Sequence, residues 1–145
     1  MTQLRVTLDT NVLVAGLRSR NGASFQVLSR WLRGDFNACA SVPLWLEYEA
    51  TLKRGDVATA HGLSGDEIDA LLDAWAVHVV PVELRFVWRP QLRDPKDEMV
   101  LETALNGRAD ALVTFNRADF GKAVQRFGLA LWRPQELLAR LGDDS

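Results

Sequence analysis

The chain has 145 residues, of which 48% are hydrophobic and 25% charged, values that suit one compact soluble domain with one core. The formal net charge is −2, whereas a simple nucleic-acid-binding module usually carries a clear excess of basic residues. An enzyme that binds divalent ions can be mildly acidic, because the ions supply positive charge where a phosphate must approach. No apolar run is long enough to span a bilayer, no secretory signal pattern is present, and the single cysteine, Cys39, excludes an internal disulfide and a cysteine-based zinc site. We therefore expect a cytoplasmic protein.

The first half of the chain alternates short β-branched runs with amphipathic segments. Apolar residues recur at helical spacing before Gly34, Pro43 is typical of a first helical turn, and Ser64 with Glu67 has capping-box spacing. Pro81 places the third strand at or near a sheet edge. We expect, in chain order, a strand at 5–8, a helix at 23–33, a strand at 36–40, a helix at 43–54, a loop at 55–62, a helix at 64–75 and a strand at 77–82.

The second half continues the same alternation after an irregular stretch at 85–93. Asp94 can cap a helix that Pro95 opens and Gly107 ends. After it we expect a strand at 111–115, a turn and short helix at 116–128, a strand at 129–132 and a helix at 134–141. With no repeat, low-complexity segment or linker, residues 1–141 are predicted to form a single domain and 142–145 a frayed tail.

Alternating strands and helices predict an α/β fold in which helices cover both faces of the sheet. The expected architecture is a three-layer α/β/α sandwich around a central, mainly parallel sheet of about five strands. In such sheets ligands bind beyond the carboxyl ends of the strands. The positions of the acidic residues relative to those ends are therefore informative.

Five polar side chains are predicted near that edge. Asp9, Asn116 and Asp119 follow strands, whereas Glu47 and Asp97 lie in the first turns of helices. Clustered carboxylates raise one another's pKa, so a fold keeps them where a cation neutralises them. Mg²⁺ and Mn²⁺ favour carboxylate and water oxygens, and one or two such ions can lower the pKa of a water and stabilise the leaving oxygen in phosphodiester cleavage. The pattern thus indicates a metal-dependent phosphodiesterase.

Each acid also has a purely structural interpretation. Asp9 and Asp119 can cap helices, and Asp97 can be a first-turn acid that the helix dipole favours. Glu49 is a rival to Glu47 on another side of the same helix. Asp94 is interpreted as an N-cap, and other acids as turn or solvent-exposed residues: Asp110, Asp66, Glu67, Asp69 and Asp73.

Four segments, "LDTNVLVAGL", "SVPLWLEYEATLKR", "RDPKDEMVLETAL" and "ALVTFNRADF", resemble the signature segments of a PIN domain, and the nearest match is the group related to VapC-type toxins. The resemblance implies an α/β/α sandwich and metal-dependent cleavage of RNA that leaves a 5′-phosphate. It implies that the ion, Mg²⁺ or Mn²⁺, is held by four catalytic acids, Asp9, Glu47, Asp97 and Asp119, with Asn116 as an additional ligand. Thr10, Asn11 and Thr114 would support the site by hydrogen bonds. Many relatives carry an aspartate in place of Asn116, so a second tightly bound ion is in question.

The substrate would reach the acids along a basic rim that gives affinity without sequence preference. The rim candidates are Arg18, Arg20, Lys53, Arg54, Arg93, Arg117 and Lys122. Trp88 can stack on a base or be buried in its loop, and burial is the commoner role for a tryptophan. The resemblance further implies a small antitoxin that blocks the acidic groove, and homodimers.

Two other functions compete with the ribonuclease. A PIN-fold module that binds RNA or a protein without cleavage is favoured by Asn116 and disfavoured by the retained acids. A phosphatase with Asp9 as nucleophile, like the haloacid dehalogenases, needs an aspartate two residues later, where this chain has Asn11. That third interpretation ranks below the other two.

Overall fold

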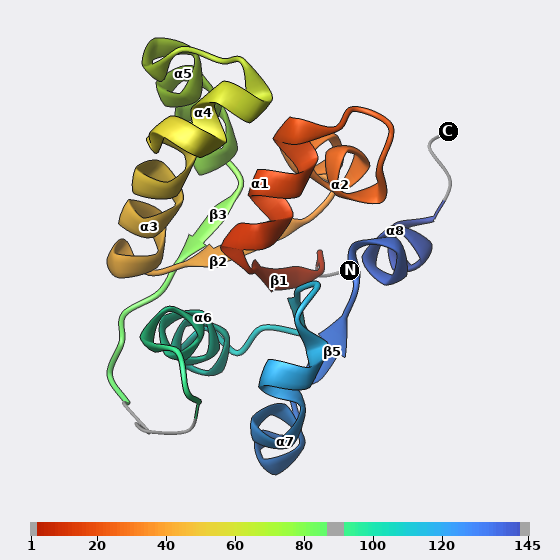
Figure 1. The fold of residues 1–145 in the computed structure, drawn as a ribbon. Helices are drawn as coiled ribbons and strands as arrows, with labels where there is room; N and C mark the ends of the chain where they lie inside the picture. Colours follow the sequence, from red (N-terminus) through yellow and green to blue (C-terminus); the bar gives the residue numbers. More distant parts are fainter. Residues whose placement is uncertain (1–2, 87–91, 143–145) are drawn as a thin grey trace.

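The computed structural model describes residues 3–86 and 92–142 and contains five strands and eight helices within them (Figure 1). In chain order the elements are β1 (Arg5–Leu8), α1 (Thr10–Arg18), α2 (Ala23–Leu32), β2 (Asn37–Ala40), α3 (Val42–Lys53), α4 (Gly55–His61), α5 (Gly65–Ala76), β3 (Val79–Pro81), α6 (Pro95–Asn106), β4 (Ala111–Val113), α7 (Arg117–Phe127), β5 (Ala130–Trp132) and α8 (Pro134–Leu141).

The five strands form one parallel sheet in the order β3-β2-β1-β4-β5. Helices α6 and α7 lie on one side of it, and α1, α2, α3 and α5 pack with one another on the other side, where α8 contacts α2 (Figure 1). The predicted α/β fold with a central parallel sheet is confirmed, and β3 is an edge strand as Pro81 indicated.

The strand order reverses between β1 and β4. From β1 the chain moves outward to β2 and β3, and it then returns across the sheet to β4, which pairs with β1 through Leu8 and Val113. Crossovers in opposite directions leave a crevice beyond the carboxyl ends of the two strands, where ligands bind in open α/β sheets. Asp9 and Thr114 are the residues that directly follow these two strand ends.

Two helices were not predicted. The stretch after Asp9 forms α1, although Val12 and Val14 give it a β-branched character, because Val12, Leu13 and Gly16 are buried against the neighbouring layer. A Cβ on Gly16 would lie 2.5 Å from the Leu28 side chain, so glycine permits the close approach of α1 to α2.

Residues 55–61, predicted as a loop, form α4, a short helix that ends at Gly62 in the left-handed conformation. Its glycine, aspartate and threonine are weak helix formers, so its sequence does not reveal it. The strands predicted at 77–82 and 111–115 are shorter, at Val79–Pro81 and Ala111–Val113. Trp88 and the centre of the irregular stretch lie outside the described residues.

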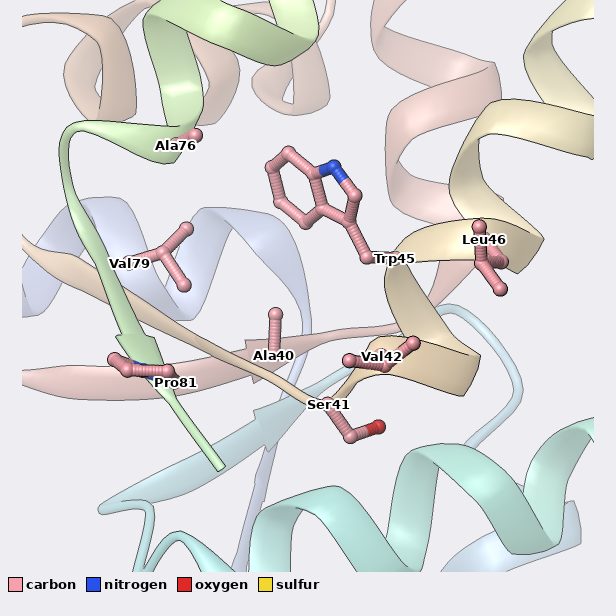
Figure 2. Close-up of a pocket in the computed structure, with 8 residues that line it drawn as sticks. All are labelled: Ala40, Ser41, Val42, Trp45, Leu46, Ala76, Val79 and Pro81. Carbon is pink, nitrogen blue, oxygen red and sulfur yellow. The ribbon is translucent and has the colours of Figure 1, made fainter. Parts of the chain in front are cut away.

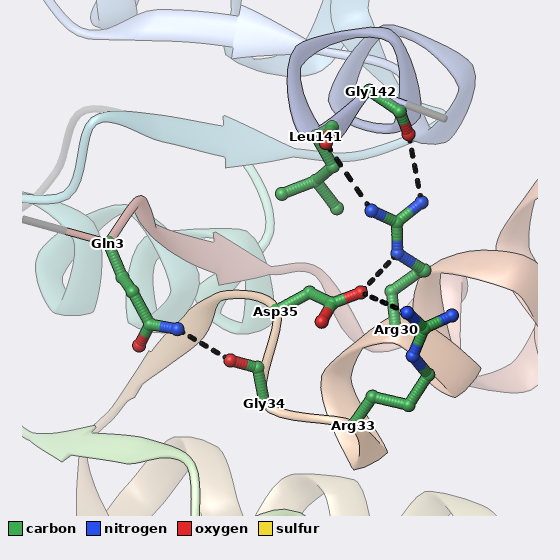
Figure 3. A network of polar contacts seen from close by, with 7 residues as sticks. All are labelled: Gln3, Arg30, Arg33, Gly34, Asp35, Leu141 and Gly142. Carbon is green, nitrogen blue, oxygen red and sulfur yellow. Dashed lines mark hydrogen bonds and ion pairs between the residues drawn. The ribbon is translucent and has the colours of Figure 1, made fainter. Parts of the chain in front are cut away.

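A polar clamp fixes the end of α8 to α2 (Figure 3). Arg30 donates to the carbonyls of Gly142 at 3.1 Å and Leu141 at 3.4 Å, and its Nε contacts the carboxylate of Asp35. Gly142, expected in a frayed tail, is therefore held, whereas 143–145 lie outside the described residues. The extent of the single predicted domain stays a prediction.

An apolar groove of about 350 Å³ lies at the β3 edge, between α3 and the end of α5 (Figure 2). Trp45 is at its centre, and Val42 and Leu46 on its α3 side are 72% and 57% exposed. Pro81, which lacks an N–H, interrupts the outer edge of β3 and hinders pairing with another strand. Over the described ranges, 3–86 and 92–142, no helix has the length and apolar character that a bilayer span requires.

Candidate active site

Asp9 ends the central strand and is 6% exposed. The hydroxyl of Thr114, fully buried at the end of β4, donates to Asp9 Oδ2 at 2.7 Å. Burial raises the pKa of the Asp9 carboxyl, while the Thr114 hydroxyl and the backbone amides of Asn11 and Thr10 act against that shift. The carboxylate is thus held at the switch point of the sheet by a partner 105 residues away in the chain.

Helix capping does not account for Asp9. It occupies the N-cap position of α1, yet its side chain makes no capping hydrogen bond. Asn11, two residues after Asp9, donates from Nδ2 to the Thr114 hydroxyl at 3.4 Å. Its Oδ1 is buried with no hydrogen-bond partner in the described part of the chain. A buried carbonyl oxygen without a donor is costly, so this oxygen is available to a ligand or water at the site.

Asp97 and Asp119 come from the first turns of α6 and α7 and line a cleft of about 490 Å³, which we call the acidic cleft. The pKa of Asp97 is raised to about 6, first by burial and then by the negative charges of Asp9, Asp94 and Asp119, with a smaller effect of Glu98. The charge of Asp119 also raises the pKa of Asp9. The charges of the three acids, which were predicted from separate motifs, therefore interact electrostatically.

Asn116 is exposed at the N-cap position of α7 and, like Asp9, makes no capping bond with its side chain. Its backbone N–H donates to the Thr114 hydroxyl at 2.9 Å. That hydroxyl therefore connects Asn11, Asn116 and Asp9. Asp94, predicted as a cap, does accept from the N–H of Lys96 at 2.9 Å, and it also adds negative charge to the acidic cleft.

Glu47 lies apart from the three aspartates. Its Oε1 accepts from the Thr51 hydroxyl at 2.9 Å and is 3.4 Å from Lys96 Nζ. The Glu47 side chain is 19% exposed and that of Lys96 60%. Within the described residues, Glu47 is not one of the charges that shift the pKa of Asp97. Its rival, Glu49, is paired with Lys53 at 3.3 Å.

The residues of the predicted basic rim lie at separate places in the structure. Arg93 and Lys122 line the acidic cleft beside Asp97 and Asp119. Arg18 and Arg54 line a separate small pocket, and Arg20 is exposed in the loop after α1.

Three rim cations form ion pairs with acids outside the cleft. Lys53 is 2.7 Å from Asp69, Arg54 is 2.8 Å from Asp56, and Arg117 is 3.5 Å from Glu136. Lys96 was not predicted as a site residue, although its position directly before Asp97 in "DPKDEM" is the signal that would have identified it.

The donor set fits a hard divalent ion in its chemistry. Asp9, Asp97 and Asp119 supply carboxylate oxygens, and their mutual repulsion leaves negative charge that a cation would neutralise. The orphaned Asn11 Oδ1 adds an acceptor for a water that such an ion keeps. The described residues contain no group of three His, Cys, Asp or Glu placed to hold a metal, so the aspartate side chains are not yet arranged around one ion.

A comparison with protein families finds that a model described as PIN domain matches residues 5–118. No curated protein matches the chain. PIN domains are typically nucleases and generally use divalent metal ions. The match covers four of the five strands and every candidate acid except Asp119, which follows its end directly. The chain belongs to the PIN domain family.

Proposed function

We propose that this protein is a metal-dependent endoribonuclease and the toxin of a toxin–antitoxin pair of the VapC type. The observation that carries the proposal is the electrostatic coupling of three aspartates beyond the strand ends: the charges of Asp9 and Asp119 raise the pKa of Asp97, and the charge of Asp119 raises that of Asp9. A nuclease needs such a site because bound cations must approach phosphate there. The cytoplasm, where RNA is accessible, is the compartment we propose.

Asp9, Asp97 and Asp119, with the amide oxygen of Asn116, would hold Mg²⁺ or Mn²⁺. When bound, the ion would supply positive charge to the phosphodiester and lower the pKa of a water molecule. Thr114 fixes the orientation of the Asp9 carboxylate, and the backbone amides of Thr10 and Asn11 help to keep it ionised. Asp97 and Asp119 would have to approach Asp9 more closely than they do here, since no such group is assembled among the described side chains.

RNA would enter along the acidic cleft. Arg93 and Lys122 flank its acids and can bind phosphates on either side of the reacting group. Arg18 and Arg20 are exposed at and after the end of α1, while Lys53, Arg54 and Arg117 form ion pairs with neighbouring acids. We therefore expect Arg93 and Lys122 to contribute most to RNA affinity.

Cleavage of a fluorogenic single-stranded RNA with Mn²⁺, Mg²⁺ or EDTA tests the proposal. The expected result is metal-dependent cleavage that leaves a 5′-phosphate, and its loss in Asp9→Asn and Asp97→Asn with a melting temperature at or above that of the parent. Asp73→Asn is the matched control, because Asp73 is an exposed acid on α5. A contaminant-free parent that cleaves no RNA with either ion would refute the enzymatic proposal.

A binding module without catalysis is the second candidate, favoured by the neutral Asn116 and by the dispersed arrangement of the acids. It predicts RNA or protein binding that is insensitive to EDTA. Calorimetric titration with Mn²⁺ separates the two functions, since only the nuclease requires a bound ion.

The proposed partners are an antitoxin that covers the acidic cleft and a second copy of the chain. The apolar groove at β3 supports the homodimer, because Val42 and Leu46 are exposed there. Light scattering should give a dimer mass for the parent and a monomer mass for Leu46→Asp. A monomeric parent would refute this part of the proposal.

A further inference from the structure

A second cleft, of about 720 Å³, lies between the C-terminal end of α6 and the segment that follows β3. Apolar residues such as Val80 and Leu105 line it together with three arginines, Arg5, Arg85 and Arg108. We call this cleft the arginine groove. None of its described lining residues belongs to the acidic cleft, so it is a separate feature of the surface.

The wall of the arginine groove is fixed by Asn106, the last residue of α6. Its Oδ1 accepts from the backbone N–H groups of Arg85 at 3.1 Å and Phe86 at 3.0 Å, and its Nδ2 donates to the Phe86 carbonyl at 2.9 Å. Arg5 Nη1 donates to the carbonyl of Gly107 at 3.3 Å. The segment that passes α6 after β3 (Figure 1) is therefore tied to the helix end, and the groove has a defined shape.

Arg108 is held in a backbone conformation that disfavours it. Its φ is +51°, and it is the one residue other than glycine with a positive φ in the described ranges, 3–86 and 92–142. The N–H of Arg108 donates to Leu105 and that of Ala109 to Ala104, a helix ending in which glycine usually takes the place of Arg108. The chain has its glycine one residue earlier, at Gly107. Strained positions of this kind persist where the side chain has a function.

The arginine groove carries excess positive charge beside an exposed aromatic ring. Glu83 is the one acid among its described lining residues, and it is paired with Arg85 at 2.9 Å. Arg108 is exposed and takes part in no ion pair within the described residues. Phe86 is 63% exposed.

Positive charge next to an aromatic side chain is the combination with which proteins bind single-stranded nucleic acid, because arginines contact the phosphates while bases stack on the ring. A small inorganic anion would leave the apolar lining of the groove without a contact. A duplex would keep its bases away from Phe86, because they are stacked and paired inside it. The chemistry of the groove therefore favours a single strand.

Helix α6 connects the arginine groove to the acidic cleft. Asp97, in its first turn, lines the acidic cleft, whereas Leu105 and Asn106, at its end, line the groove. Asp97 and Asn106 are separated by about 14 Å of helix, at a rise of about 1.5 Å per residue. One single-stranded RNA can therefore reach both places, but a dinucleotide cannot.

We propose that the arginine groove is a second RNA-binding site, which holds the part of a single strand that extends beyond the acidic cleft. Arg108 contacts a phosphate of that part, and Phe86 stacks on one of its bases. This inference rests on the proposed function, because it takes RNA as the substrate of the acidic cleft.

The first test is binding of a fluorescein-labelled single-stranded RNA of about 12 nucleotides in EDTA, where no cleavage occurs, at several salt concentrations. Arg108→Gly should lower the slope of log affinity against log salt by about 0.7, the value for one lost phosphate contact, which weakens binding about fivefold at 0.1 M salt. Its melting temperature should equal or exceed that of the parent, because glycine relieves the positive φ. Arg108→Lys should retain most of the slope.

Arg140→Gln is the matched control. Arg140 is exposed on α8 and lies over the ring of Trp132 in β5, at the opposite edge of the sheet from β3. It removes the same charge and should leave the slope unchanged. An unchanged slope in Arg108→Gly, or an equal loss in Arg140→Gln, would overturn the inference.

The second test identifies the ligand of the groove. Phe86→Ala should weaken RNA binding about tenfold with no change in the salt slope, because stacking involves no phosphate. Unlabelled single-stranded RNA should displace the labelled strand, whereas 5′-AMP and duplex RNA at the same nucleotide concentration should not. Displacement by 5′-AMP would indicate a mononucleotide site, and equal displacement by the duplex would exclude stacking on Phe86; either result would overturn the inference.

Cleavage in Mn²⁺ separates this inference from the proposed nuclease function. Arg108→Gly should raise the KM of the 12-nucleotide RNA about fivefold with an unchanged kcat, and it should not alter cleavage of a dinucleotide. Cleavage by the variant with an unchanged KM for the longer RNA would overturn the inference and leave the nuclease intact. RNA binding that depends on Arg108 and Phe86, in a parent that cleaves neither substrate, would support the groove and remove the nuclease proposal.

Discussion

The Thr114 hydroxyl donates to the Asp9 carboxylate at 2.7 Å inside the protein, joining the ends of two neighbouring parallel strands. Both residues are buried, so little water reaches this bond. Hydrogen bonds to ionised groups in such surroundings contribute more than those between neutral groups.

Thr114→Val should therefore destabilise the fold by about 2 kcal/mol, because valine keeps the shape and removes the donor. The pKa of Asp9, already raised by burial, should rise further. Thr114→Ser keeps the hydroxyl and should lose only about 1 kcal/mol. Urea unfolding gives the free energies, and carboxyl NMR gives the pKa. Equal losses in the two variants would show that the bond to Asp9 contributes nothing.

Asp97 should make stability depend on pH. Its pKa is raised to about 6 from 3.8, so the folded protein binds the proton more tightly than the unfolded chain does. Stability is then lost as pH rises from about 4 through about 6, because the fold must accommodate the ionised carboxyl. The side chain is partly exposed, and screening reduces the cost at neutral pH to about 1 kcal/mol.

Asp97→Asn should accordingly raise the melting temperature by about 3 °C at neutral pH in EDTA and leave it unchanged near pH 4. Asp66→Asn, an exposed acid on α5, is the control and should show no such pH-dependent gain. Scanning fluorimetry across this pH range suffices. A melting temperature of Asp97→Asn below that of the parent at neutral pH would contradict the raised pKa.

Tyr48 supports the strand that carries Asp9. Its buried hydroxyl donates to the carbonyl of Leu8, the residue before Asp9. Tyr48→Phe should cost about 1–3 kcal/mol of unfolding free energy, since the buried carbonyl loses this donor. Urea unfolding should show a lower midpoint with an unchanged slope. An unchanged midpoint would mean that the carbonyl finds another donor.

Arg30 should control the order of the last helix. Its guanidinium bonds the carbonyls of Leu141 and Gly142 together with Asp35, which needs the planar fork of arginine. Arg30→Lys should increase the rate of amide hydrogen exchange at the end of α8 about tenfold, because the free energy of local opening should fall by about 1.4 kcal/mol. Arg33→Lys is the control, because Arg33 is more exposed and lies 3.5 Å from the same Asp35. Similar exchange in both variants would refute the clamp.

Much of the fold could be predicted because its signals are local. Pro95 and Pro134 open helices, Ser64 and Glu67 form the predicted capping box, and β1 ends where its β-branched run ends. Helix α1 could not be predicted in this way, since its apolar residues suit a strand as well as a helix. Its conformation is decided by packing at Gly16 against Leu28, a contact between separate elements.

The same distinction applies to the site. The resemblance implied that Thr114 supports the site, and the structure explains how, because the parallel strands β1 and β4 bring their carboxyl ends to one edge. The pairing of Glu47 with Lys96 could not be predicted, since it depends on how α3 and α6 approach each other from different crossovers. Sequence position alone therefore grouped Glu47 with the aspartates. In the structure Glu47 differs from them because it is paired with Lys96.

The position of β1 beside β4 has a consequence for how the protein is made. Leu8 pairs with Val113, and two of the cluster's acids lie at 97 and 119, so residues about 100 positions apart must be present before the site exists. Contacts of such long sequence separation form late, after the loop-closure entropy has been overcome. During synthesis, a nascent chain that has exposed only its first half carries Asp9 without its partners. The acidic site can therefore assemble only after residue 119 has left the ribosome, so a shorter nascent chain does not contain it.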